Sequence, residues 1–162
     1  MPTIELVTSI AAPIDRVFDL ARSIDLHTHS TSRTGERAVA GVTTGLIGLN
    51  EEVTWRARHF GVWQSLTVRI TAFARPTHFT DVMLRGAFRS MEHHHDFETA
   101  ANGTTTMRDR FHFRSPLGIL GRFVDYLVLT RHMKSLLIER NRVIKAIAES
   151  DDWEKYLPHG SK

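Results

Sequence analysis

Two neighbouring segments decide the fold: residues 91–98, with the sequence MEHHHDFE, and residues 105–111, with the sequence TTMRDRF. Side chains of a β-strand alternate between its two faces. One face of the first segment therefore carries Met91, His93, His95 and Phe97, and the other carries Glu92, His94, Asp96 and Glu98. The apolar Met91 and Phe97 mark the first face as the buried one. Two histidines are thus predicted to point into the interior.

The residues between these segments predict a β-hairpin. Ala101-Asn102-Gly103 suits a three-residue loop, because glycine is favoured at the last position of such a loop. The loop sets which residues lie opposite each other: His95 and Asp109, His93 and Phe111, Phe97 and Met107. The buried face then carries an imidazole–carboxylate pair. Such a pair is costly to bury unless it is hydrogen-bonded, so we expect it to be satisfied either internally or by a ligand.

The segments before this hairpin predict further strands joined by short turns. Together with residues 3–10, alternating segments separated by glycine and proline turn signals give these expected strands: about 36–41, 50–60, 62–74, 78–85, 88–99 and 104–114. Short connections favour antiparallel pairing. We therefore expect a curved antiparallel sheet of about seven strands.

Along the sequence, helices are expected before and after the run of strands at residues 36–114. A helix begins at residues 12–15, and a second short helix starts at Ser23 and ends before the polar run that opens at Thr28. After residues 115–118, one long helix is predicted to extend to about Ser150. Its apolar stripe consists of Leu120, Phe123, Val124, Leu127, Met133, Leu136, Leu137, Val143, Ile144 and Ile147. The fold class is α+β, with a single domain over residues 1–150 and a polar C-terminal tail over residues 151–162 that docks or frays.

Composition narrows the classes of function. The chain has 162 residues and a formal charge of +3, from 21 basic and 18 acidic side chains that are scattered along it. Scattered charge does not predict a nucleic-acid partner. Cysteine is absent, which excludes disulfides and thiolate metal sites. No apolar run is long enough to span a bilayer and the first residues do not resemble a signal peptide, so we expect a cytoplasmic protein. The oligomeric state has no signal in the sequence.

The order of predicted elements resembles the helix-grip fold of the START / Bet v 1-like superfamily, in its polyketide cyclase/dehydratase-like bacterial branch. The resemblance covers about residues 3–149 and is most specific in three stretches: 10–18 (IAAPIDRVF), 53–61 (VTWRARHFG) and 81–97. It implies a sheet wrapped around the long C-terminal helix, with a hydrophobic small molecule held between them. In one subgroup two histidines and a later aspartate recur, matching His93, His95 and Asp109.

The residues expected to contact a ligand are Trp55, Asp81, Met83, Met91, His93, His95, Phe97, Met107 and Asp109. Core packing is an alternative for Trp55 and for the methionines. Asp81 depends on the connection that follows it. A two-residue turn at Gly86-Ala87 points Thr80, Val82 and Leu84 inward, whereas one extra residue points Asp81 and Met83 inward. Periodicity favours the first arrangement, and the resemblance favours the second.

We expect a binding protein for a small hydrophobic or amphipathic ligand, with no cofactor. The spacing of His93 and His95 would let both reach one metal ion with Asp109 as a third ligand. We nevertheless predict no metal, because a catalytic zinc site needs three convergent protein ligands and only the two histidines lie at a reliable spacing. The first alternative is a cyclase or dehydratase in which His95 is the acid/base and Asp109 orients it. The second is an interaction module with a vestigial, filled cavity.

Overall fold

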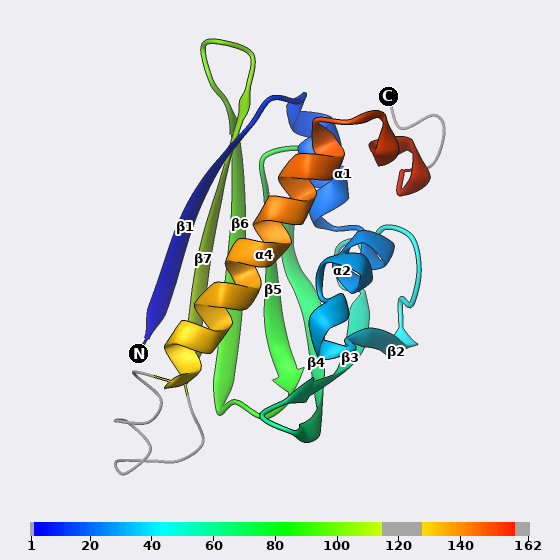
Figure 1. Cartoon of the computed structure of the whole chain (residues 1–162), viewed down its shortest axis with the longest axis vertical. Coiled ribbons are helices and arrows are strands. Elements are labelled where there is room, and N and C mark those ends of the chain that lie inside the picture. Colours follow the sequence, from blue (N-terminus) through cyan, green and yellow to red (C-terminus); the bar gives the residue numbers. More distant parts are fainter. Residues whose placement is uncertain (1, 115–127, 158–162) are drawn as a thin grey trace.

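The computed structural model describes residues 2–114 and 128–157. Its strands form one seven-stranded antiparallel sheet in the order β1-β7-β6-β5-β4-β3-β2 (Figure 1). The strands are β1 (Thr3–Ile10), β2 (Arg37–Gly41), β3 (Glu52–His59), β4 (Val62–Ala74), β5 (His78–Arg85), β6 (Ser90–Thr99) and β7 (Thr105–Arg114). Each predicted strand is confirmed within two residues at either end. The chain runs as a meander from β2 to β7, and β7 then pairs with β1.

The helices lie on one face of this sheet. Helices α1 (Ile14–Ala21) and α2 (Ile24–Ser30) follow β1, and α4 (Thr130–Ala148) crosses the sheet diagonally beside them (Figure 1). Two short 3-10 helices, η1 (Ser32–Thr34) and η3 (Asp151–Lys155), complete the described chain. The predicted α+β helix-grip architecture is confirmed. The predicted start of the long helix falls in residues 115–127, outside the described residues.

Two details of local structure follow from single side chains. Ser23 caps α2, because its hydroxyl accepts a hydrogen bond from the backbone N–H of Leu26. The helix then continues through the polar residues up to Ser30, so its predicted end before Thr28 was too early. Pro13 stands immediately before α1 with extended backbone angles, where its missing N–H is not needed by the helix.

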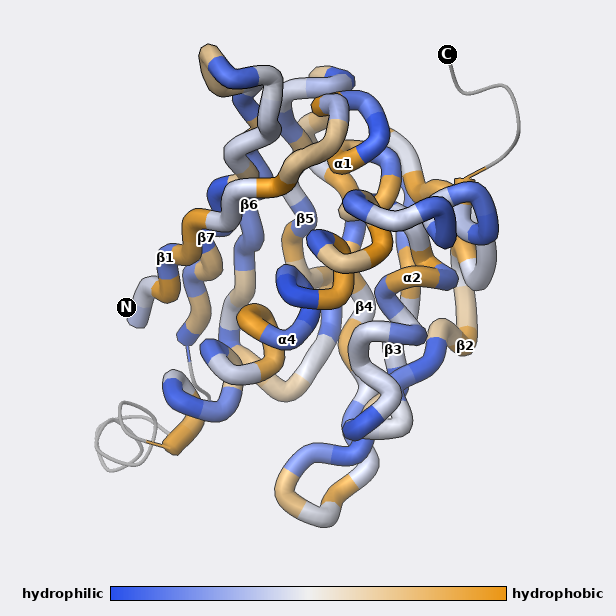
Figure 2. The backbone as a smooth tube through the Cα atoms, turned by 45° about the horizontal axis from the view of Figure 1, so that its top comes forward, coloured by the Kyte–Doolittle hydropathy of each residue, from blue (hydrophilic) through white to orange (hydrophobic). Residues whose placement is uncertain are grey.

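An aromatic cluster joins α1 to the sheet. Phe18 is fully buried, and its ring meets those of Phe73, Phe79 and Phe97 edge to face, with centroids 5.3 to 5.4 Å apart. Along α4, hydrophobic and hydrophilic positions alternate in the helical repeat (Figure 2). Burial of a large apolar side chain such as Phe18 contributes about 1.5–3 kcal/mol. The core therefore fixes the helices against one face of the sheet.

The first part of the predicted polar tail packs against the domain. The Arg16 guanidinium lies 4.3 Å from the ring centroid of Trp153, and Leu157 is buried. Tyr156 is hydrogen-bonded to His29 of α2. Residues 151–157 thus hold the end of α4 against α1 and α2.

Candidate functional site

A cavity of about 450 Å³ lies between the sheet and helices α2 and α4. Its wall is mostly apolar. The apolar lining includes Ile24, Ile47, Val53, Trp55, Val68, Ile70, Phe79, Met91, Phe111, Met133 and Leu137. One group of polar side chains on this wall comes from β5, β6 and α4: Asp81, His93, His95 and Arg140. We call Asp81, His93 and His95, together with Asp109 behind them, the histidine–aspartate cluster.

The β5–β6 connection brings Asp81 into this cluster. Residues 86–89 separate the two strands, a longer connection than a two-residue turn. Asp81 consequently pairs in register with His93, and Phe79 pairs with His95. The arrangement implied by the resemblance is therefore the one observed, and the periodicity argument was wrong here because it assumed the tighter turn.

The β6–β7 hairpin has the predicted register. His95 lies opposite Asp109, His93 opposite Phe111, and Phe97 opposite Met107. The side chains of the hairpin bring His95 close to Asp109 as expected, at 2.8 Å, and also form hydrogen bonds that the register alone does not predict. His93 Nε2 donates to Asp109 Oδ1 at 3.1 Å, and His95 Nε2 donates to Asp81 Oδ1 at 3.1 Å.

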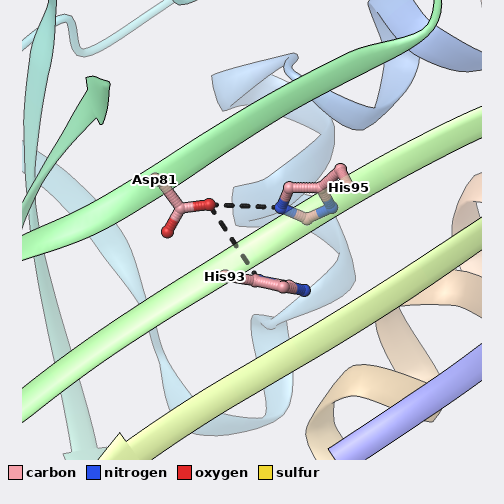
Figure 3. A group of neighbouring side chains, drawn as sticks. All are labelled: Asp81, His93 and His95. Carbon is pink, nitrogen blue, oxygen red and sulfur yellow. Dashed lines mark hydrogen bonds and ion pairs between the residues drawn. The ribbon is translucent and has the colours of Figure 1, made fainter. Parts of the chain in front are cut away.

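The second nitrogen of each imidazole faces the other carboxylate. His93 Nδ1 lies 4.0 Å from Asp81 Oδ1 (Figure 3). His95 Nδ1 lies 2.8 Å from Asp109 Oδ1, but outside hydrogen-bond geometry, and has no other partner among the described residues. The two rings are only 3.8 Å apart between centroids. Two carboxylates and two imidazoles thus form one compact group in which each histidine lies between both aspartates.

Asp109 forms the floor of the cluster and does not reach the cavity wall. It is 1% exposed, and the amide Nδ2 of Asn141 donates to its Oδ2 at 2.6 Å. The guanidinium of Arg140 approaches its Oδ1 to 3.6 Å. The same guanidinium donates to the carbonyl of Ala21 at 2.8 Å, which ties α4 to the end of α1.

Sequence reasoning missed Arg140 and Asn141. Both are buried on α4, at positions that continue the spacing of its buried residues: Leu137, Arg140, Asn141, Ile144 and Ala148. That spacing of three and four residues defines one helical face. A polar pair inside this repeat was the available signal, because polar residues that share the buried face of a helix need partners in the interior.

Burial and the neighbouring charges together set the protonation states of the cluster. Burial, followed by the neighbouring His95, lowers the pKa of His93 to about 4. Burial also opposes charge on His95, but the carboxylates of Asp109 and Asp81 outweigh it and raise the pKa of His95. Burial raises the pKa of Asp109, yet the two histidines reverse this effect and hold its pKa well below the usual range. Near neutral pH the cluster therefore holds a neutral His93 beside a carboxylate pair.

The other residues predicted to contact a ligand fall into two groups. Trp55 and Met91 lie on the cavity wall. Met83, Phe97 and Met107 pack against the core and do not line that wall, and Phe97 lies instead against Phe18 of α1. These three residues and Asp109 are therefore not on the cavity wall.

A second polar group surrounds Trp55. The ring of His27 stacks on the indole with a centroid separation of 4.1 Å and an interplanar angle of 28°. His27 Nε2 donates to Glu36 Oε2 at 3.3 Å. The cavity thus has polar groups on its α2 side as well as at the histidine–aspartate cluster.

Three possible metal-donor atoms of the cluster lie close together. One ligand atom each from Asp81, His93 and His95 lie within 4.8 Å of one another (Figure 3). The third member is Asp81, whereas the spacing in the sequence had suggested Asp109.

Among the described helices, none combines the length and the apolar character needed to cross a membrane.

Solved structures share this fold. The protein TTHA0849 from Thermus thermophilus matches with a TM-score of 0.70 and 17% identity, over 91% of this chain and 99% of that one. Major latex-like protein 151 from Panax ginseng matches at 0.65 and 15%, over 92% and 98% of the two chains. A START superfamily protein from Mycobacterium smegmatis matches at 0.67 and 10%, over 91% and 97%. The resemblance to START / Bet v 1-like proteins is confirmed at the level of the fold.

Comparisons based on sequence add nothing to this result. No family model matches the chain, and no curated protein matches it. One fold can host many functions. The function must therefore be argued from the cavity and the side chains that line it.

Proposed function

We propose that this protein binds a small hydrophobic or amphipathic molecule in the cavity between the sheet and α4. The observation that carries the proposal is a cavity of about 450 Å³ with a mostly apolar wall that is interrupted by buried polar groups. Small-molecule sites are typically concave, of roughly 300–1,000 Å³, and lined by apolar residues with a few polar groups that fix orientation. The cavity has these properties.

The polar part of the ligand would meet the histidine–aspartate cluster. Neutral His93 can accept a hydrogen bond at Nδ1, whose nearest carboxylate oxygen lies 4.0 Å away. Asp81 is partly exposed, and its carboxylate can accept a hydrogen bond from a ligand hydroxyl. The apolar part would pack on side chains such as Val68, Ile70 and Met91. A ligand with one hydroxyl-bearing end fits this distribution better than a wholly apolar one.

In the enzyme alternative, the pair that faces the substrate differs from the His95–Asp109 pair expected from the sequence. A cyclase or dehydratase would need an acid/base group that faces the substrate. The cavity-facing pair is His95 with Asp81, joined at 3.1 Å, while Asp109 lies behind both histidines. Turnover of a bound molecule would distinguish this alternative from simple binding. The interaction-module alternative expected a filled interior, and the cavity weighs against it.

Fluorescence of 1-anilinonaphthalene-8-sulfonate, a dye that brightens in apolar sites, tests the proposal. Val68 lies on the cavity wall in β4, so Val68→Phe should fill part of the cavity and weaken dye binding at least about tenfold, equivalent to about 1.4 kcal/mol. Val7→Phe is the matched control, because Val7 is 64% exposed on β1. The control should bind the dye like the wild type.

Two results would overturn the proposal. One is dye binding that is absent in the wild type. The other is binding that Val68→Phe leaves unchanged although circular dichroism shows a folded variant. If the wild type does bind the dye, fractions of host lipids can be tested for displacement of it. Mass spectrometry of a displacing fraction would give the chemical class of the ligand. The cytoplasmic location and the lack of a nucleic-acid partner stay predictions from the sequence.

A further inference from the structure

We infer that Asp81, His93 and His95 form a binding site for a divalent first-row transition metal ion at the wall of the cavity. The three side chains come from two adjacent strands whose register places Asp81 beside His93. Two imidazoles and one carboxylate are a ligand set that such ions bind with coordination positions left open. This site goes beyond the proposed function, and it does not depend on an organic ligand.

The donor atoms are already close to the positions that a metal requires. His95 Nε2 lies 3.1 Å from Asp81 Oδ1, and His93 Nδ1 lies 4.0 Å from the same oxygen. Metal–ligand distances of about 2.0–2.2 Å place two donors roughly 3–4 Å apart. Small side-chain rotations would therefore bring all three atoms to a common ion, with Asp81 Oδ1 between the two nitrogens (Figure 3).

Asp109 orients both imidazoles for this role. The nitrogen of each ring that does not face Asp81 faces Asp109 Oδ1, at 3.1 Å for His93 Nε2 and 2.8 Å for His95 Nδ1. Metal-bound histidines usually direct their other ring nitrogen to a carboxylate or carbonyl, which fixes the ring and its tautomer. Here one buried carboxylate serves two rings. His95 Nδ1 is buried, lacks a well-directed hydrogen bond among the described residues and has Asp109 Oδ1 as its neighbour at 2.8 Å.

The charges of the cluster leave room for a cation. Asp81 and Asp109 carry two negative charges, and the guanidinium of Arg140, 3.6 Å from Asp109, supplies one positive charge. Buried charges are normally balanced by partners. A proton on His95 balances the remaining negative charge in the metal-free protein, and a bound metal ion would take its place. Because the three ligands lie on the cavity wall, the open positions of the ion would face the cavity.

Direct titration of the purified full-length chain tests the inference. The chain would first be stripped with a chelator and an organic extraction, so that no bound ligand contributes. Zn²⁺ is then titrated by calorimetry, and Co²⁺ by visible absorption, which reports the coordination number of the ion. We expect one ion per chain and Co²⁺ bands typical of nitrogen and oxygen ligands.

Two matched substitutions separate this site from adventitious binding. Asp81→Asn keeps the shape of the side chain and removes the anionic ligand, so Zn²⁺ affinity should fall roughly 100-fold or more. Asp96→Asn is the control. Asp96 pairs with His78 at 2.7 Å and with Arg110 at 2.8 Å on the opposite face of β6, and none of these groups lines the cavity. Its affinity should remain within about twofold of the wild type.

A further variant tests the role of Asp109 as a positioning residue. Asp109→Asn should weaken Zn²⁺ binding about 10–100-fold while the Co²⁺ spectrum keeps the same ligand type. If this variant does not fold, the Asp81→Asn comparison still decides the question. The inference is wrong if the wild type binds no Zn²⁺ above surface background, or if Asp96→Asn weakens binding and Asp81→Asn does not. Neither result would affect dye binding, which is measured without metal.

Discussion

Two buried aspartates on the helix side of the sheet are stabilised by different kinds of donor. Asp19 on α1 is 2% exposed and accepts hydrogen bonds from Arg22 at 2.8 Å and from Arg75 at 2.8 Å. Asp109 on β7 is 1% exposed and accepts hydrogen bonds from a histidine and an asparagine, with a second histidine at 2.8 Å and an arginine farther away, at 3.6 Å. Both carboxylates stay ionised, because in each case the donors outweigh the effect of burial on the pKa.

The donors determine what each aspartate can do. Arginine keeps its proton at any physiological pH and does not ligate metals, so the Asp19 group can only hold structure together. It does so by joining α1, the segment at Ile47 and the turn at Arg75. Histidine can lose its proton, accept a hydrogen bond or bind a metal. The Asp109 group therefore combines a structural role with groups that can interact with a ligand in the cavity.

The largest expected effect follows from Asp109→Asn. The substitution leaves the guanidinium of Arg140 and the two buried imidazoles without their common carboxylate. Removal of one partner from a buried charged group typically costs about 3–5 kcal/mol. We expect a loss of this size in the free energy of unfolding, measured by urea denaturation at pH 7. A loss below about 1 kcal/mol would mean that Asp109 is no more important than a surface ion pair.

The pH dependence of stability should reveal the two histidines separately in the metal-free protein. The pKa of His93 is lowered to about 4, so the unfolded chain binds a proton here between about pH 6.5 and 4 and the folded chain does not. The free energy of unfolding should therefore fall by about 3 kcal/mol as the pH drops through this window. The pKa of His95 is raised, so its contribution is complete below about pH 6.5 and is lost as the pH rises through its folded value.

NMR titration of the imidazole Cε1–H signals checks this assignment. His93 should titrate near pH 4 and His95 above its ordinary range. In Asp109→Asn the midpoint of His95 should move down, because one of the two carboxylates that stabilise its charged form is gone. Equal midpoints near 6.5 for both histidines, or an unchanged His95 midpoint in the variant, would contradict the pairing.

The next effect concerns the donor from α4. Asn141 donates to Asp109 Oδ2 at 2.6 Å and has no equivalent among the Asp19 donors. Asn141→Ala leaves a buried carboxylate oxygen with one donor fewer, which should cost about 2 kcal/mol in urea denaturation. A double-mutant cycle with Asp109→Asn should give a coupling energy of about 0.5–3 kcal/mol. Additive losses would show that Asn141 stabilises the fold independently of Asp109.

The sequence predicted three members of the histidine–aspartate cluster better than the fourth. Alternation and a glycine-ended loop were enough to place His93, His95 and Asp109 on one buried face, because strand periodicity and hairpin register are local properties. The face of the sheet to which Asp81 points could not be predicted in the same way, because it depends on whether the connection between β5 and β6 is a two-residue turn or the longer segment 86–89.

The remaining parts of the cluster depend on tertiary packing. Arg140 and Asn141 meet Asp109 only when α4 lies across the sheet at one particular position, and no local pattern fixes that position. The additional partners of the histidines have a similar origin. Opposed backbone positions predicted the approach of His95 to Asp109, which is 2.8 Å, but not the well-formed bonds from His95 to Asp81 and from His93 to Asp109, which depend on side-chain rotation.

The smallest effect should come from Asp19→Asn, although Asp19 is as buried as Asp109. The side chains of Arg22 and Arg75 are 15% and 31% exposed, so both guanidiniums can turn toward water when the carboxylate is removed. The expected loss in the free energy of unfolding is about 1–2 kcal/mol, between the values for exposed and for fully buried pairs. This loss should become smaller in acid. The pKa of Asp19 is lowered in the folded protein, so its carboxylate stabilises the fold above about pH 4, and this contribution disappears as the pH falls through the pKa of the folded state. A loss equal to that of Asp109→Asn would show that burial of the carboxylate alone, and not access of its partners to water, sets the cost.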